Sequence, residues 1–289
     1  QTHSILRYGL DRLLPPQIEL IHGPGCPVCV TPVECLDEAM ALAGMENLVL
    51  CTFADMLRVP GTEQDLLSAK AAGADVRTIY SPLEAVTLAR DNPQKEVVLF
   101  AVGFETTAPA NALSVLRAEQ AQLDNFSLLT SQVLVPPAIA TILQAGDNRV
   151  QGFLAAGHVC TIMGTDQYQP LVERFNIPLV VTGFEPVDLL LGIEACIRQL
   201  EHGQARVENL YARWARPDGN PVARQLLEQV FTVCDRPWRG LGMIKASGLT
   251  LNSRYAAFDA RRRFSLSLPH AATSGSCRAG EVLTGRLRP

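Results

Sequence analysis

Short runs of apolar and β-branched residues recur along the chain, and most of them lead into segments whose apolar positions have helical spacing. The runs that predict strands are IELI (18–21), NLVLCTF (47–53), DVRTIY (75–80), EVVLFAV (96–102), FSLLTSQV (126–133), VQGFLAA (150–156) and IPLVVTG (177–183). Alternation of strand and helix is typical of a largely parallel, doubly wound sheet. The pattern therefore predicts an α/β protein.

Two helix starts can be read from their capping residues. The segments TPVE (31–34) and SPLE (81–84) each place a hydroxyl side chain before a proline, with a glutamate three residues after the hydroxyl. A hydroxyl N-cap, a proline at the first helical position and a glutamate at the third mark a helix N-terminus. We expect the first helix to begin after Thr31 and to end near Gly44.

Polar residues follow several of the predicted strands. The tripeptide Gly-Phe-Glu follows a strand twice, at 103–105 and at 183–185, and Gly157-His158 follows a third strand. The loop HGPGCPVC (22–29) follows IELI. Ligand sites in open α/β sheets form at the carboxyl ends of strands. The repetition predicts two similar lobes whose loops line a cleft, although each loop taken singly is equally compatible with a solvated surface turn.

Composition narrows the class of protein. The chain has 289 residues, of which 47% are hydrophobic and 19% charged, so we expect a compact globular protein of about two domains. The net charge of −4 argues against a nucleic-acid or anionic-membrane partner. No apolar run reaches the roughly 18 residues of a membrane span, and no signal-peptide pattern opens the chain. Because residue 1 is Gln rather than Met, we expect the native N-terminus to lie upstream.

The eight cysteines do not form the dense pattern of a secreted disulfide scaffold, which favours a reducing cytoplasm. Cys51, Cys196 and Cys234 lie in apolar or helical contexts, where a free cysteine acts as a small buried hydrophobe. Cys26 and Cys29 differ, because two glycines and a proline precede them. They are the candidates for redox or metal chemistry.

The CPVC segment leaves several chemistries open. Cys29 precedes the expected start of a helix, so we expect its thiolate to be stabilised and its pKa lowered. A thiol–disulfide pair fits the spacing, and so does a transition-metal or iron–sulfur role. A structural zinc site would need two more nearby ligands, and the sequence has no second CxxC. An inert buried pair is the fourth reading.

Six longer motifs carry a resemblance to one family. They are HGPGCPVCVTP (22–32), GFETTAPANA (103–112), GHVCTIMGTDQYQP (157–170), VTGFEPVDLL (181–190), WRGLGMI (238–244) and GEVLTG (280–285). In this order they resemble the HypD family of [NiFe]-hydrogenase maturation proteins. The resemblance implies a cytoplasmic scaffold, rather than a conventional enzyme, on which the Fe(CN)₂CO unit is assembled. It implies a HypC-type chaperone and a HypE-type cyanide donor as partners, with the hydrogenase large subunit served through HypC.

The resemblance also assigns residues. Cys26 and Cys29 match the family's paired redox thiols, and Cys277 matches one ligand of its [4Fe–4S] cluster. The residues matching its cleft motifs, expected to shape the iron site or a partner-facing groove, are His3, His22, Glu105, Thr106, His158 and Glu185. The family's fold implies two doubly wound parallel-sheet lobes around a cleft, plus a smaller, mostly helical iron–sulfur-associated region. We expect these at 17–125, at 126–202, and at 1–16 with 203–289, respectively.

Two departures from the family pattern affect these expectations. The family has a cysteine loop before YGLDRLLP, of which only a tail ending in His3 is present here, and Cys277 stands without the neighbouring cluster cysteines. A four-iron cluster needs about four thiolates. We therefore expect a chain cut at both ends that neither binds the iron unit nor completes the cluster unaided. The alternatives are a free-standing CxxC thiol–disulfide oxidoreductase and a purely structural binding module.

Overall fold

The computed structural model describes residues 1–23, 25–146 and 148–266. These residues fall into two compact units. The described parts of 1–25 and 135–224 form one, which contains a three-stranded sheet and is termed the three-stranded unit. The described parts of 26–134 and 225–266 form the other, which contains a six-stranded sheet and is termed the six-stranded unit. The α/β class predicted from the sequence is confirmed.

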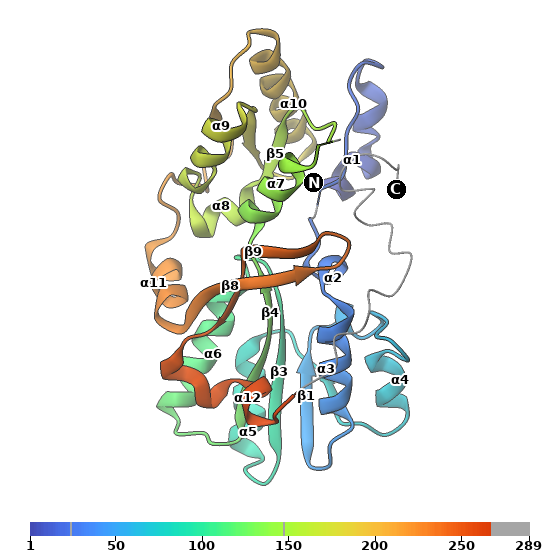
Figure 1. Ribbon diagram of the computed structural model, residues 1–289, viewed down its shortest axis with the longest axis vertical. Coiled ribbons are helices and arrows are strands. Elements are labelled where there is room, and N and C mark those ends of the chain that lie inside the picture. The colour runs from blue at the N-terminus through green and yellow to red at the C-terminus, as the bar shows by residue number, and fades with distance from the viewer. Residues whose placement is uncertain (24, 147, 267–289) are drawn as a thin grey trace. The chain divides into compact units, whose positions relative to one another are not determined.

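The six-stranded sheet has the strand order β2-β1-β3-β4-β9-β8 (Figure 1). Its strands are β1 (Leu48–Thr52), β2 (Val76–Thr78), β3 (Glu96–Gly103), β4 (Phe126–Val133), β8 (Phe231–Trp238) and β9 (Gly242–Leu251). The first four are parallel, whereas β9 pairs antiparallel with β4 and with β8. The sheet is therefore mixed, because a β-hairpin extends its parallel part.

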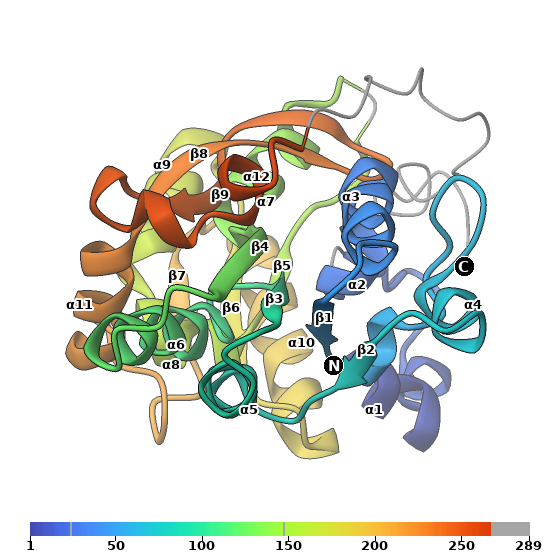
Figure 2. The same ribbon diagram turned by 90° about the horizontal axis from the view of Figure 1, so that it is seen from below.

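Helices cover both faces of the parallel strands, as expected of a doubly wound sheet (Figure 2). Those of this unit are α2 (Pro27–Val30), α3 (Val33–Ala43), α4 (Leu66–Ala71), α5 (Pro82–Asp91), α6 (Ala108–Gln120) and α12 (Ala260–Arg263). On one face Leu36 of α3 and Ala260 of α12 pack in one core with Leu50, Phe100 and Leu129 of the strands. Helices α5 and α6 lie together on the opposite face.

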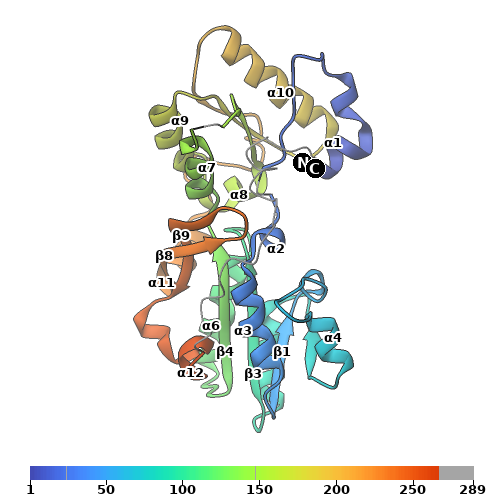
Figure 3. The same cartoon turned by 45° about the vertical axis from the view of Figure 1, so that its right-hand side comes forward.

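The three-stranded sheet is parallel, with the order β5-β6-β7. Its strands are β5 (Phe153–Ala156), β6 (Leu179–Thr182) and β7 (Val207–Asn209). The helices of this unit are α1 (Thr2–Tyr8), α7 (Val135–Gln144), α8 (Gly157–Met163), α9 (Gln169–Phe175) and α10 (Pro186–Glu201), and α11 (Pro221–Val230) precedes β8 in the chain. Helix α1 lies beside α10 (Figure 3), and Ile5 and Leu10 pack there against Leu189.

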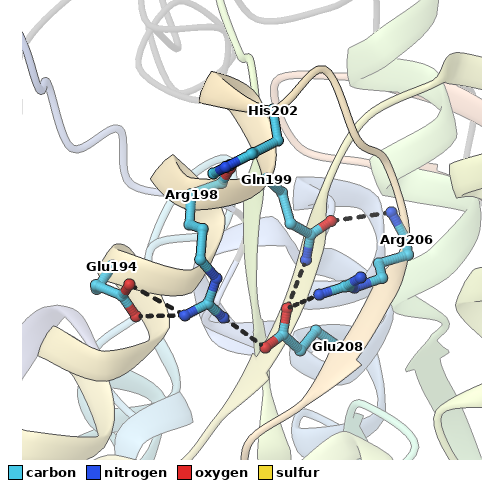
Figure 4. A network of polar contacts seen from close by, with 6 residues as sticks. All are labelled: Glu194, Arg198, Gln199, His202, Arg206 and Glu208. Carbon is cyan, nitrogen blue, oxygen red and sulfur yellow. Dashed lines mark hydrogen bonds and ion pairs between the residues drawn. The ribbon is translucent and has the colours of Figure 1, made fainter.

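A polar network fastens the edge strand β7 to the end of α10 (Figure 4). Arg198 of α10 bonds both Glu194 and Glu208, and Glu208 belongs to β7. The buried amide of Gln199 donates to Glu208 at 3.0 Å and accepts from the N–H of Arg206 at 3.0 Å. Gln199 therefore bonds both the backbone before β7, at Arg206, and the side chain of Glu208 within β7. These two bonds hold β7 in position beside α10.

Six of the seven strands predicted from apolar runs are confirmed. The exception is IELI, whose residues form no regular element. Leu20 in this run packs against the cluster of Ile5, Leu10 and Leu189 instead of lying in a sheet. The apolar run thus marked a partly buried packing contact, and such a contact does not require a strand.

The two helix starts had different outcomes. Ser81 and Glu84 form a complete capping box at the start of α5, as predicted. The helix predicted after Thr31 is present and ends at Gly44 as predicted, but Thr31 as its cap was wrong, because Pro32 is the N-cap residue of α3 and no side chain caps it. The hydroxyl of Thr31 donates instead to the carbonyl oxygen of Pro27 at 2.8 Å, within the preceding short helix α2.

The units divide the chain differently from the ranges expected from the sequence. Strand β4 (126–133), expected in the second lobe, pairs with β3 along its length and lies in the six-stranded unit. The region after residue 203, expected to be mostly helical, contributes β7 to one sheet and the β8–β9 hairpin to the other. No helix in the described part of the chain combines the length and apolar composition that a membrane crossing requires.

Candidate functional site

The CPVC segment folds as a short helix, α2, rather than as an open loop. Cys26 is its N-cap residue, Pro27 occupies its first position, and the N–H of Cys29 donates to Sγ of Cys26 at 3.4 Å. Both cysteines are free; Cys26 is half-buried and Cys29 exposed. Helix α2 leads directly into α3, and α3 runs antiparallel to β1, the strand that follows it. The start of α3 therefore lies near the carboxyl ends of the parallel strands. Helix α2 lies there too and packs against β3.

The carboxyl end of β3 is held by a buried amide. In the orientation that satisfies both of its ends, the side chain of Gln132 donates to the carbonyl oxygen of Phe104 at 3.0 Å. Its oxygen accepts from Gly103 N–H at 3.2 Å and from Asn111 Nδ2 at 2.8 Å. A Cβ on Gly103 would collide with the side chain of Thr107 and approach the Gln132 amide nitrogen to 2.9 Å, so any larger residue there would displace these side chains. Glu105 lies in this turn with 1% of its surface exposed.

The β8–β9 hairpin joins α2 to this turn. The ring of Trp238 stacks on Phe104 with 6.2 Å between centroids, and its indole N–H donates to Ser247 Oγ at 3.0 Å. The next residue, Arg239, donates its backbone N–H to the carbonyl oxygen of Val30 at 2.9 Å. Three chain segments that are distant in sequence therefore meet around Cys29 within the six-stranded unit.

The thiol of Cys29 is less acidic than expected. Its partial burial raises its pKa to about 11, and its hydrogen bond to Cys26 and the charge of that sulfur act in the same direction. The charge of Arg239 opposes them. The expectation of a lowered pKa is therefore wrong, because partial burial and the neighbouring Cys26 outweigh the groups that favour the thiolate.

A second group of predicted residues lies at the carboxyl ends of β5 and β6. His158 follows β5 and is half-buried, with its ring centroid 5.1 Å from that of Phe184, which follows β6. Its Nδ1 is buried without a hydrogen-bond partner among the described residues. Burial lowers the pKa of His158, which favours a neutral imidazole. Glu185 is the exposed N-cap residue of α10.

The start of the chain reaches the same sheet edge. The amide of Gln1 donates to Thr182 Oγ1 at 2.7 Å and to the carbonyl oxygen of Ala155 at 3.3 Å. Thr2 Oγ1 and His22 Nδ1 are hydrogen-bonded at 3.0 Å, whereas His3 is exposed on α1. The first residues and the loop that begins at His22 are thus tied to the carboxyl end of the three-stranded sheet.

Sequence reasoning missed a tyrosine that covers this edge. A Cβ on Gly157 would collide with the ring of Tyr211, and a Cβ on Gly183 would approach that ring to 2.9 Å, so the ring lies directly on both glycines. Arg213 lies 4.7 Å above the ring and forms a two-point ion pair with Asp188, which lowers the pKa of that carboxyl. The signal available in the sequence was the glycine that directly follows each strand.

The predicted site residues thus fall into two groups. Cys26, Cys29, Glu105 and the half-buried Thr106 belong to the six-stranded unit. His3, His22, His158 and Glu185 belong to the three-stranded unit. Cys277 lies outside the described residues.

The described residues alone do not fit an iron–sulfur cluster. Among them, no three His, Cys, Asp or Glu side chains are grouped so that they could hold a metal ion. Four cysteines, Cys35, Cys51, Cys160 and Cys196, are buried separately in the cores. A cluster needs about four convergent thiolates, and the thiols of this part of the chain converge only as the pair on α2.

Comparison with known proteins relates the whole chain to one family. A family model described as HypD, hydrogenase formation hypA family, matches residues 1–289. The hydrogenase maturation factor HypD of Rhodobacter capsulatus is 46% identical over 295 residues, which cover all of this chain and 78% of the relative. The proteins of the same name from Escherichia coli K12 and Azotobacter vinelandii are 43% and 44% identical, with the same coverage.

Proposed function

The chain belongs to the HypD family of hydrogenase formation proteins, and we propose that it is the scaffold on which the Fe(CN)₂CO unit of a [NiFe]-hydrogenase is assembled. The support is the match over the full chain, together with relatives that are named hydrogenase maturation factors. The iron unit is the cargo of this scaffold. The partners in the proposal are a HypC-type chaperone, which carries the unit to the hydrogenase large subunit, and a HypE-type cyanide donor.

One observation carries the chemical part of the proposal: α2 bears two free thiols near the carboxyl ends of the parallel strands. In a sheet with the order β2-β1-β3-β4, the chain passes from β1 to one side, to β2, and then crosses to the other side, to β3 and β4. In open α/β sheets, ligands typically bind outside the carboxyl ends of the strands where the chain changes side, which here is between β1 and β3. Cys26 and Cys29 are therefore in the region of the fold where bound groups are usually handled. A dithiol can supply two electrons and two protons when it closes to a disulfide.

The second residue group supports a role in shaping a polar site. The lowered pKa of His158 keeps its imidazole neutral near pH 7, and a neutral imidazole can accept a hydrogen bond or donate a lone pair. Glu185 and His22 lie on the loops of the same unit. In the proposal these residues contact the iron cargo or a partner protein.

A [4Fe–4S] cluster with Cys277 as one ligand stays a prediction of the family resemblance. Iron and sulfide quantitation on the anaerobically purified protein, with electronic and EPR spectra, tests it directly. About four irons per chain would support the prediction. An iron-free protein whose Cys26 and Cys29 still cycle reversibly would favour a free-standing thiol–disulfide oxidoreductase.

The test of the proposed function is replacement of the homologous gene in a hydrogenase-producing bacterium. The Cys26→Ser variant is expected to abolish hydrogenase activity and the cyanide and carbonyl infrared bands of the large subunit, while the variant still co-purifies with the HypC-type chaperone. Cys234→Ser, on the partly exposed strand β8, is the matched control and should mature hydrogenase normally. Normal maturation with Cys26→Ser would refute the thiol role, and loss of chaperone binding would favour the structural module.

A further inference from the structure

Arg236 of strand β8 is a buried cation that forms no ion pair with a carboxylate in the described part of the chain. The residue is 8% exposed. Its Nη2 donates to the carbonyl oxygen of Leu249 at 2.8 Å and to Sγ of Cys234 at 3.5 Å, and its Nε is buried without a hydrogen-bond partner. A guanidinium stays charged in a folded protein, and a buried charge without a counter-ion is costly. The guanidinium therefore lies in a place that an anion would stabilise.

The backbone of the hairpin directs Arg236 inward. A β-bulge interrupts the pairing of β8 with β9 between Cys234 and Arg236, and bulges change the direction of side chains. Gly248 on β9 leaves room for the arginine, since a Cβ there would lie 2.8 Å from Nε of Arg236. The neighbouring carboxylate of Asp235 is engaged elsewhere, because its Oδ1 accepts the backbone N–H of Ala246 at 2.9 Å. The guanidinium is thus separated from the nearest acid in sequence and lies beside a thiol.

Cys234 is the group beside this cation that can acquire a negative charge. The sequence predicted a buried apolar role for it, but the thiol is free and partly exposed, on the strand at the edge of the six-stranded sheet. Small solutes in solvent therefore have access to it. An oxygen atom added to Sγ would be within reach of Nη2 of Arg236, which already lies 3.5 Å from the sulfur. That oxygen would supply both the negative charge and the hydrogen-bond acceptor that Arg236 lacks.

We propose that Cys234 is a site of oxidation by hydroperoxides and that the guanidinium of Arg236 binds the resulting sulfenate. The substrate class is hydrogen peroxide and other small hydroperoxides. The site is separate from Cys26 and Cys29, so this inference goes beyond the proposed function and does not depend on it. The reduced thiol of Cys234 takes no part in the proposed maturation chemistry, so Cys234→Ser stays a control there.

The oxidation is a single balanced step. The thiol of Cys234 gives its proton to solvent, and the thiolate attacks one oxygen of hydrogen peroxide. The S–O bond forms, the O–O bond breaks, and hydroxide leaves and takes up a proton from solvent to become water. The sulfur loses two electrons and the peroxide gains two. The sulfenic acid then loses its own proton to solvent, and the sulfenate oxygen accepts hydrogen bonds from Arg236.

Binding of an anion beside Arg236 is tested with Cys234→Asp and the matched control Cys234→Asn. The two new side chains have nearly the same shape and differ in charge. Cys234→Asp is expected to unfold at a urea concentration about 0.5 M higher than Cys234→Asn, because its carboxylate pairs with the guanidinium. In an Arg236→Met background this difference should disappear. Urea unfolding of the full chain, followed by circular dichroism, gives the midpoints.

Oxidation is tested by treating the reduced full chain with hydrogen peroxide and dimedone, which traps sulfenic acids, and by quantifying the labelled Cys234 peptide with mass spectrometry. A Cys26→Ser background prevents the thiol pair from closing to a disulfide and keeps Cys29 as an internal control. Arg236→Met is expected to lower the labelling of Cys234 about threefold or more without changing that of Cys29. Arg236→Lys, which keeps a charge, should retain most of the labelling.

Three outcomes would overturn the inference. Equal urea midpoints for Cys234→Asp and Cys234→Asn would show that Arg236 binds no anion at this place. Absence of label at Cys234 would show that peroxide does not oxidise it. Equal labelling with and without the guanidinium would show that exposure alone controls the oxidation. If Arg236→Met does not fold, the first two measurements still decide, because both are made with Arg236 in place.

Discussion

The indole of Trp238 stacks on the phenyl ring of Phe104 at an interplanar angle of 28°, and the two residues belong to segments more than 130 positions apart in the chain. Phe104 lies in the turn that ends β3, and Trp238 ends β8. This contact ties the antiparallel extension of the sheet to the turn that carries Glu105. The hairpin tip and the thiol helix depend on it, because Arg239 directly follows Trp238.

Replacing Trp238 with alanine should destabilise the six-stranded unit. A fully buried Trp loses both its transfer free energy and its packing, so we expect the free energy of unfolding to fall by about 3–5 kcal/mol. Urea unfolding followed by circular dichroism measures the change. Trp214→Ala is the matched control, because Trp214 is 67% exposed and its loss should change stability by no more than about 0.5 kcal/mol. Equal effects of the two substitutions would contradict the anchoring role.

Replacing Gln132 with alanine should loosen the turn at 103–107. The substitution leaves Gly103 N–H and the carbonyl oxygen of Phe104 without their partner in a buried place, at a cost of about 1–3 kcal/mol. Hydrogen exchange should show faster exchange at Gly103 than in the wild type. Gln120→Ala removes an exposed side-chain contact to Arg117 and should leave that amide unchanged. Unchanged exchange in Gln132→Ala would disprove the role of the amide.

Removing only one partner of the ion pair between Arg261 and Glu38 should lower the free energy of unfolding. Arg261 makes a contact of 2.6 Å with Glu38 of α3 and also donates to the carbonyl oxygen of Thr130 at 2.8 Å. Arg261→Ala leaves a largely buried carboxylate unpaired, for which we expect a loss of about 3–5 kcal/mol. The double variant Arg261→Met/Glu38→Leu should recover most of it.

An exposed pair provides the control for this measurement. Arg254 and Glu119 lie at 3.4 Å with both side chains largely in solvent, so Arg254→Ala should cost about 0–1 kcal/mol. Thermal or urea unfolding of these variants beside the wild type gives the comparison. A double variant as unstable as Arg261→Ala would show that the loss comes from packing rather than from the unpaired charge.

The imidazole of His158 should titrate below the usual range. Burial lowers the pKa of His158 in the folded state, so folding favours the neutral imidazole. The neutral imidazole therefore contributes fully to the free energy of unfolding above the unfolded pKa of 6.5. This contribution is lost as the pH falls through the lower pKa of the folded state. NMR titration of the ring protons measures the midpoint. Phe184→Ala exposes one side of the ring and should raise the midpoint toward 6.5. His158→Asn should remove this part of the acid dependence of unfolding, and a midpoint above 6.5 in the wild type would contradict the prediction.

The strands of the parallel sheets could be predicted because they are buried on both sides. Val97 to Ala101 of β3 are all fully buried, so the strand reads as a continuous apolar run. Strand β8 reads differently, because only Phe231, Arg236 and Trp238 of its residues are buried and because it contains Pro237. Its structure depends on pairing with β9 and on the packing of the hairpin against β4 and Phe104, and this packing is not local in sequence.

The positions of some candidate residues could be predicted for the same reason. Glu105 follows a strand of the six-stranded sheet, and His158 and Glu185 follow strands of the three-stranded sheet, as their apolar runs indicated, while their roles stay predictions. Gln132, Trp238 and Tyr211 carry no such signal, since their importance lies in what they contact across the fold. The acidity of Cys29 was mispredicted for the same reason, because the local helix start suggested one electrostatic environment and tertiary burial produced another.

Helix α2 lies near the carboxyl ends of the parallel strands, and this has a consequence for how the proposed thiol chemistry depends on concentration. A diffusible cofactor in that region would occupy its site according to its dissociation constant and would be lost on dilution. Cys26 and Cys29 are part of the chain, so their occupancy of that region is complete at every concentration. The two sulfurs also meet each other at the high effective concentration of an intramolecular reaction. In the proposed function, the electrons that this pair can deliver would therefore follow the redox state of its surroundings and not the supply of a small molecule.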